Sequence, residues 1–109
     1  MISVEYAQAM ANYNRDMNAR LYECCATLTD EQRKRDAGAF FKSIHGTLNH
    51  LLLGDLLWLG RFTNKPVHIQ SLAQELYADF VELRAERDKV DARIIEWVSG
   101  LSATDLANN

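Results

Sequence analysis

Hydrophobic residues recur at helical spacing along three long stretches of the chain. In the first, residues 4–28, they alternate in steps of four and three, which is typical of a helix that buries one face. This stripe consists of Met10, Asn14, Met17, Leu21, Cys24 and Leu28. The opposite, solvated face consists of Asn12, Arg15, Asp16, Arg20 and Glu23. The polar member of the stripe, Asn14, is either an amide that fixes helix register or part of a site.

The last stretch has the same spacing and predicts a long helix of about seven turns. Its stripe consists of Leu76, Phe80, Leu83, Arg87, Val90, Ile94 and Trp97. Ser71 followed by Gln74 three residues later is a capping-box pattern, which predicts that the helix begins there. The pair Ser99 and Gly100 is a helix C-terminal signal.

The middle stretch, residues 43–62, is apolar nearly all round, which predicts a central helix covered on several sides. Asp55 lies on its greasier face, where a carboxylate needs a donor or a cation, and Asn14 is a candidate partner. His50 lies on the face of small residues. Because a glycine inside a helix costs about 1 kcal/mol relative to alanine, Gly46 and Gly54 indicate that a helix or a ligand needs room beside His50.

Local signals divide these helices. Thr29 and Gln32 form a capping-box pattern at the start of a short helix that runs to about Arg35. Residues 36–38 break that helix, and Ser43 is the expected N-cap of the next. We expect Phe40 and Phe41 to lie under the bundle, residues 63–66 to be a connection and residues 101–109 to begin another short helix.

These elements predict one all-α domain over residues 1–109, an up-down bundle of three long helices with short connections. Three helices leave one side of an apolar central helix uncovered. Either a fourth helix is missing or a partner supplies it, because an exposed apolar surface of that size marks an interface.

The composition narrows the functional class. The 109 residues are 48% hydrophobic and 25% charged, with a net charge of −3 and scattered basic residues, which argues against nucleic-acid binding. The N-terminus does not resemble a signal peptide and no segment has the apolar length of a membrane span, so we expect a cytoplasmic protein. Cys24 and Cys25 do not have the spacing of a redox motif, and we expect at most one of them to be buried.

Residues 43–62, SIHGTLNHLLLGDLLWLGRF, with the preceding LTDEQRKRDAGAFFKS, resemble the DinB family, also called the DinB/YfiT-like fold. The resemblance implies a four-helix bundle, often dimeric, that holds a divalent metal through three histidines. The first of these is the histidine of an Asn-His pair, which falls on His50. The family's aspartate and tryptophan fall on Asp55 and Trp58 and support the bundle or the site.

The family's other two ligands come from an H-x-x-x-H pair on a later helix, and this pair is absent here. His45, His50 and His68 are the histidines of the chain, and no two of them are four residues apart. The chain thus resembles the N-terminal two-thirds of a family member. It is a truncated gene product, an experimental fragment or a natural short form that completes its bundle by dimerising.

Two functions follow. The first is a DinB-like protein dependent on nickel, zinc or manganese, a thiol-dependent transferase or a hydrolase that uses a small-molecule thiol. A twofold homodimer would then bring two His50 side chains together. The second is a stress-associated, non-enzymatic homo-oligomer or interaction module that has lost the metal site. In that alternative His50 is a buried structural residue. If these residues have no role in a site, we expect His45 to be structural, Trp58 and Trp97 to be core aromatics, and His68 to be a surface residue.

Overall fold

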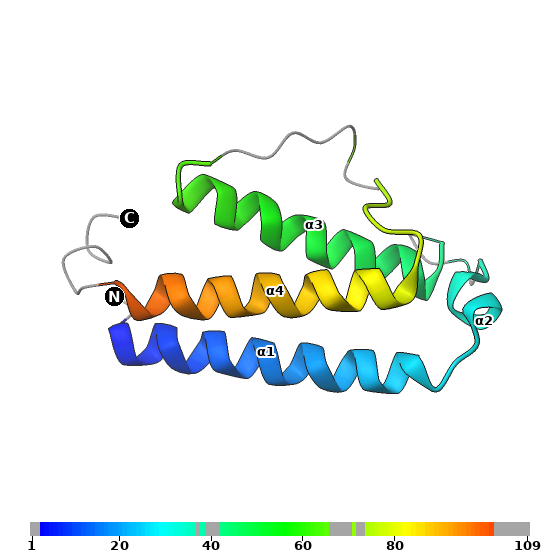
Figure 1. Ribbon diagram of the computed structural model, residues 1–109, viewed down its shortest axis with the longest axis horizontal. Helices are drawn as coiled ribbons and strands as arrows, with labels where there is room; N and C mark the ends of the chain where they lie inside the picture. Colours follow the sequence, from blue (N-terminus) through cyan, green and yellow to red (C-terminus); the bar gives the residue numbers. More distant parts are fainter. Residues whose placement is uncertain (1–2, 37, 39–41, 66–70, 72–73, 102–109) are drawn as a thin grey trace.

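The computed structural model is a bundle of three long helices and one short helix (Figure 1). It describes residues 3–36, 38, 42–65, 71 and 74–101. The helices are α1 (Val4–Ala26), α2 (Asp30–Lys34), α3 (Ile44–Phe62) and α4 (Phe80–Ser99). All regular elements of this described part are helices, which confirms the all-α class. Because α4 packs against both α1 and α3, it is the central helix, and the prediction that residues 43–62 would be central is wrong.

The helices do not alternate in direction as an up-down bundle would. Helix α1 is antiparallel to α4. Asn18 in α1 bonds Asp91 in α4, whereas Gln8, nearer the start of α1, lies beside Ser99 at the end of α4. Helices α3 and α4 run in the same direction (Figure 1), because Asp55 pairs with Arg87 and Phe62 packs on Trp97. The connection over residues 63–79 therefore joins opposite ends of these two helices. Helix α3 has 19 residues and is about 28 Å long, which an extended connection of this length spans easily.

The capping signals read from the sequence are confirmed where a helix begins at a local motif. Thr29 and Gln32 form the complete reciprocal capping box of α2. The side chain of Ser43 accepts the backbone N–H of Gly46 at the start of α3. Helix α3 ends at Phe62 as predicted, and Gly100 is the C-cap of α4.

The buried face of α1 differs from the predicted stripe by about one residue. Ala11, Tyr22 and Cys25 are buried, whereas Met10, Met17 and Leu21 are 39%, 42% and 40% exposed. Asn14 and Cys24 are also exposed. Two polar or small positions explain the shift, because Ala11 permits close packing at the helix interface and Asn18 bonds a carboxylate of α4. The larger apolar side chains of α1 consequently lie outside the contact with α4.

The start of α4 is the second correction, because Gln74 and residues 75–79 are not helical. The helix begins at Phe80, and its N-cap is Asp79, whose carboxylate accepts the backbone N–H of Glu82. The Ser71–Gln74 pattern does not begin a helix, because the backbone of Leu76 and Tyr77 bonds side chains of α3 instead.

The hydrophobic core lies where α1, α3 and α4 meet. It contains Tyr22, Cys25, Leu48, Leu52, Phe80, Leu83 and Val90. Helix α2 is fixed to this core by Arg33, which is 9% exposed. The Arg33 guanidinium donates to the carbonyls of Cys25 and Leu28 and lies 4.0 Å from the centroid of the Phe80 ring, a cation–π contact.

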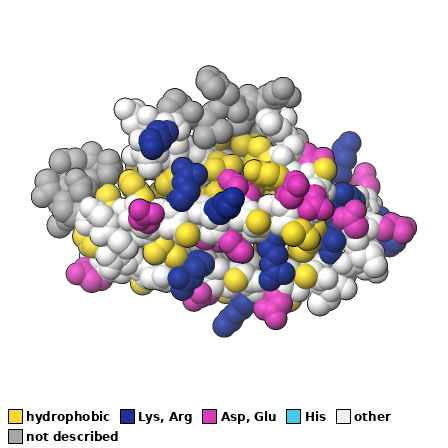
Figure 2. Space-filling view, in the orientation of Figure 1, with side chains coloured by type: hydrophobic (Ala, Val, Ile, Leu, Met, Phe, Trp, Pro, Cys, Tyr) yellow, Lys and Arg dark blue, Asp and Glu magenta, His cyan; other side chains and the backbone are white. Residues whose placement is uncertain are grey.

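The outer surface retains an apolar patch. Leu51, Trp58 and Phe62 of α3 are 47%, 40% and 38% exposed, so α3 has the uncovered apolar side that the sequence predicts. Charged side chains of both signs are spread over the face shown in Figure 2. Of the helices described, none combines the length and apolarity required to cross a membrane. Cys25 is buried and Cys24 exposed, as expected of adjacent helical residues.

Several predictions concern residues outside the described part of the chain. These are the placement of Phe40 and Phe41, the surface position of His68 and the short helix predicted over residues 101–109, of which only Leu101 is described.

Candidate functional site

His50 lies on α3, half-buried, about one turn before Asp55 and two turns before Trp58. Gly54 is one helical turn further along the same face, so its Cα faces the same surroundings as His50. A Cβ built on Gly54 would meet no atom within 4 Å. Gly54 therefore faces open space, and the prediction that a helix or a ligand occupies the space beside His50 stays a prediction.

A buried charge network joins the three long helices. The guanidinium of Arg87 is 3% exposed, and its Nη2 lies 2.6 Å from Asp91 Oδ1 and 2.5 Å from Asp55 Oδ2. Its Nε donates to the same Asp91 oxygen at 3.1 Å. The amide of Asn18 on α1 donates to both Asp91 oxygens at 3.2 Å. Asp55 therefore does find a cation, but the predicted partner Asn14 is wrong, and Asp55 itself is 45% exposed rather than buried.

Burial and charge act in opposite directions in this network. Burial lowers the pKa of Arg87, but the neighbouring carboxylates of Asp91 and Asp55 outweigh it, and the net pKa is raised. Burial raises the pKa of Asp91, and the guanidinium of Arg87 offsets this only in part. Burial also raises the pKa of Tyr22 to about 12, and its buried hydroxyl has no hydrogen-bond partner among the described residues. The network thus keeps Arg87 charged and fixes three helices against one another.

A second buried polar cluster fixes the connection between α3 and α4. Asn49, which is 1% exposed, accepts the backbone N–H groups of Leu76 and Tyr77 at 2.8 and 2.9 Å through Oδ1. Its Nδ2 donates to the carbonyl of Tyr77 at 3.2 Å. His45 Nε2 lies 2.8 Å from the same carbonyl and 3.2 Å from Glu75 Oε1. His45 is 1% exposed, and its bonds support the structural role predicted for it.

The tryptophans form a cluster at the far end of α3. The rings of Trp58 and Trp97 meet edge to face at 5.4 Å between centroids, and Phe62 contacts both at 4.9 and 5.6 Å, within the range in which aromatic pairs attract. Trp58 is 40% exposed and Trp97 half-buried, so the prediction that both are core aromatics is wrong. They lie at the surface because no described helix covers this side of α3.

The sequence model of the DinB family matches residues 1–107, nearly the whole chain. The chain belongs to the DinB family. Searches of curated proteins and of solved structures found no match. Membership in the DinB family confirms the resemblance seen in residues 43–62.

The donor set for a metal is incomplete in the described part of this DinB chain. A catalytic zinc-like site needs three protein ligands with an open position. Among residues 3–36, 38, 42–65, 71 and 74–101, no three His, Cys, Asp or Glu side chains come together in a way that could hold an ion. His45 bonds the carbonyl of Tyr77 through Nε2, and Asp55 pairs with Arg87. His50 alone does not form such a site, and a bound metal would need further ligands from outside these residues or from a second chain.

Two residues at the centres of the buried polar clusters, Arg87 and Asn49, were not predicted from the sequence. Arg87 stands as the only charged member of an otherwise apolar stripe, and such a position indicates a buried cation that needs carboxylates. Asn49 is in the Asn-His pair of α3, and its signal was weaker because any helical asparagine can be solvated. The partner residues Leu76 and Tyr77 are too distant in sequence for a local pattern to predict.

Proposed function

We propose that this DinB-family chain is a divalent-metal-binding helical protein whose site is completed between two copies, with His50 as a ligand. The observation that carries the proposal is the open space at Gly54, one helical turn from His50. His50 is half-buried, and the neighbouring Gly54 presents a face on which a side chain would meet nothing within 4 Å. A second copy can therefore approach α3 closely at this position.

Exposed apolar side chains support association through the same helix. Leu51, adjacent to His50 in sequence, is 47% exposed, and Trp58 is 40% exposed. A twofold axis would pair such a patch with itself, as isologous interfaces do. Two His50 side chains near that axis would supply half of a tetrahedral ligand set. Nickel, zinc and manganese are the candidate ions, and a small-molecule thiol is the candidate co-ligand. We assign binding to this arrangement and no reaction step.

The second candidate is a metal-free homo-oligomer or interaction module. It is supported by the pairing of the buried charges. Arg87 and Asp91 form an ion pair with each other that stabilises the bundle, so neither is left for a metal. The exposed patch of α3 would then serve association alone, and His50 would be a structural residue of the interface.

Metal content per chain separates the two. Untagged protein, loaded with nickel, zinc or manganese and dialysed, is measured by inductively coupled plasma mass spectrometry beside His50→Ala and His68→Ala. We expect one ion per two chains, lost in His50→Ala and retained in His68→Ala. Circular dichroism of each variant checks that the helices remain.

Gly54 provides the matched pair for the role of the second copy. Gly54→Ala should leave the fold intact or stabilise it by about 1 kcal/mol, because its Cβ meets open space. Gly54→Leu places a bulky side chain where the second copy approaches, so it should abolish both the dimer and the bound metal. Sedimentation velocity measures the dimer. Absence of metal from the wild-type protein, with the dimer intact, would overturn the first candidate and support the second.

A further inference from the structure

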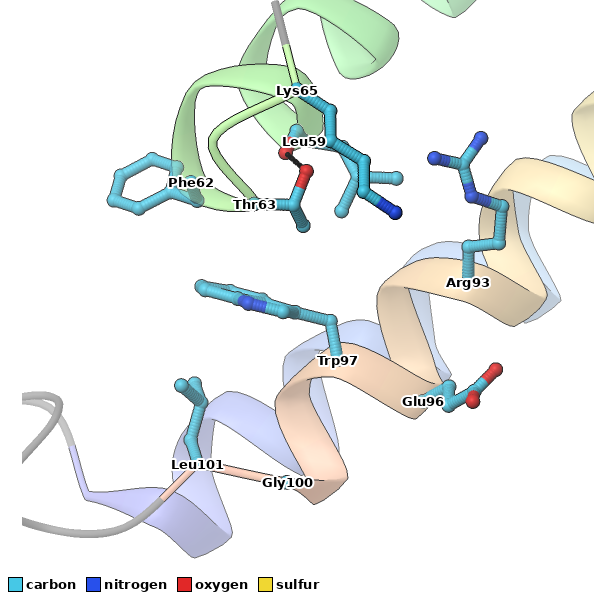
Figure 3. Close-up of a pocket in the computed structure, with 9 residues that line it drawn as sticks. All are labelled: Leu59, Phe62, Thr63, Lys65, Arg93, Glu96, Trp97, Gly100 and Leu101. Atoms are coloured by element: carbon cyan, nitrogen blue, oxygen red, sulfur yellow. Dashed lines mark hydrogen bonds between the residues drawn. The ribbon is translucent and has the colours of Figure 1, made fainter.

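An open groove lies at the end of the bundle where the C-termini of α3 and α4 meet (Figure 3). Its volume is about 590 Å³, within the roughly 300–1,000 Å³ typical of small-molecule sites. Apolar side chains from both helices and from the residue that follows the C-cap of α4 line it: Leu59, Phe62, Trp97 and Leu101. It lies about three turns along α3 from His50 and shares no residue with the proposed metal site.

Two cations line the same groove. In Figure 3 the Lys65 side chain extends from the end of α3 toward that of Arg93, which rises from α4 to one side of the Trp97 ring. Within the described part of the chain, neither forms an ion pair, whereas both buried arginines, Arg33 and Arg87, do. The acidic residue of the lining, Glu96, extends away from the ring of Trp97.

The positions of both cations are set by local structure. After α3 the chain turns through Asn64, whose φ of 60° is in the left-handed region. The backbone N–H of Lys65 donates to the carbonyl of Gly60 at 2.8 Å. Thr63 closes the same turn with two bonds to the carbonyl of Leu59, at 2.9 Å from its backbone N–H and 2.7 Å from its hydroxyl. Arg93 and Trp97 are four residues apart on α4 and therefore share one face.

We propose that this groove binds a small amphipathic anion. A flat aromatic or short acyl body would lie against Trp97 and Phe62, and its carboxylate, sulfonate or phosphate group would lie between Lys65 and Arg93. Aromatic rings pack favourably against such a body, and a guanidinium and an ammonium provide charge-assisted hydrogen bonds to its anionic group. Bringing two like charges to one opening is unfavourable, and an anion between them relieves that repulsion.

The test uses a probe pair that differs only in the anionic group. The first is 8-anilinonaphthalene-1-sulfonate and the second is N-phenyl-1-naphthylamine, its neutral analogue. Each is titrated into the full chain and followed by probe fluorescence and by ¹H–¹⁵N spectra. We expect saturable binding of the sulfonate, with shifts confined to the Trp97 indole N–H and the amides of residues 59–65 and 93–101. Trp58→Phe assigns the two indole signals.

Matched charge variants decide whether the cations recognise the probe. The double variant Lys65→Gln/Arg93→Gln should weaken sulfonate binding at least about fivefold and leave the neutral analogue within about twofold. Arg84→Gln/Lys89→Gln removes the same charge from α4 outside the groove and should leave both affinities unchanged.

Three results would overturn the proposal. One is that both double variants weaken binding of the sulfonate equally, which would indicate that the probe is attracted by the net charge alone. Another is shifts spread over α1, which would indicate a nonspecific apolar surface. The third is loss of sulfonate binding as protein concentration rises and sedimentation velocity detects dimer, which would show that a second copy occupies the groove. These readouts do not depend on metal, so failure here leaves the His50 proposal standing.

Discussion

Arg87 and Arg93 lie on the same helix, six residues apart, in opposite surroundings. Arg87 is 3% exposed and bonds two carboxylates from α3 and α4, whereas Arg93 is exposed at an open groove and has no carboxylate partner among the described residues. Residue type does not distinguish them. Because the buried cation is paired with two carboxylates of the protein, it serves the fold, and because the exposed cation has no such pair in the part of the chain described, it is available to a ligand.

The largest expected effect comes from replacing the buried arginine, Arg87. Arg87→Met leaves Asp91, which is 4% exposed, as a buried carboxylate without its cation. Breaking a buried pair in this way should lower the free energy of unfolding by roughly 3–5 kcal/mol, as measured by urea denaturation. Arg93→Met should change it by less than about 0.5 kcal/mol.

A compensating change sharpens the result for Arg87. Adding Asp91→Leu to Arg87→Met removes the unpaired charge, and should recover much of the lost stability because an apolar replacement of a whole pair is tolerated. If Arg87→Met were no more destabilising than Arg93→Met, the network would not be holding the helices together.

The next effect concerns the Asn49 cluster. Asn49→Ala leaves the N–H groups of Leu76 and Tyr77 without their acceptor, and should lower the free energy of unfolding by about 3 kcal/mol. Hydrogen exchange should show that those two amides lose protection before the amides of α1 do. Asn14→Ala, at an exposed position of α1, is the control and should have little effect. Unchanged protection at Leu76 and Tyr77 would contradict the role assigned to Asn49.

The smallest effect concerns alkaline pH. Tyr22 has a pKa of about 12 in the folded protein and about 10 in the unfolded chain, so the folded state holds the proton longer. Stability should therefore fall as pH rises from about 10 toward 12, by roughly 2–3 kcal/mol in total. Tyr22→Phe should flatten this fall and cost little at neutral pH, because the hydroxyl has no described partner.

Tyr13→Phe provides the comparison for that pH series. Tyr13 is 57% exposed and lies on the same helix, so its removal should leave the alkaline slope unchanged. Urea denaturation at pH 9, 10 and 11 measures the slopes. Equal slopes for wild type and Tyr22→Phe would show that Tyr22 titrates alike in the folded and unfolded states.

The sequence predicted those features that depend on residues within one helical turn. Thr29 and Gln32 cap α2, and Ser43 caps α3, because each signal and its target are three residues apart. The alternation of burial at Cys24 and Cys25 follows equally from helical geometry. The family resemblance was likewise readable from one continuous block.

The features that were missed depend on contacts distant in the sequence. The pattern favoured Met10 and Met17 as core residues of α1, but the approach of α4 buries Ala11 and uses Asn18 instead. Likewise, the Ser71 pattern was overridden because Asn49 holds Leu76 and Tyr77 in a non-helical conformation. The predicted up-down arrangement was also wrong, because contacts between α3 and α4 that are distant in the sequence set these two helices in the same direction.

The bonds from Asn49 to Leu76 and Tyr77 also close a loop in the chain, and they do so from inside the core. The entropic cost of closing a loop grows only with the logarithm of its length. The register of α4 against α3 is fixed by the anchors and not by the number of residues that connect them. Lengthening the connection should therefore lower the stability of the bundle far less than removing Asn49 does.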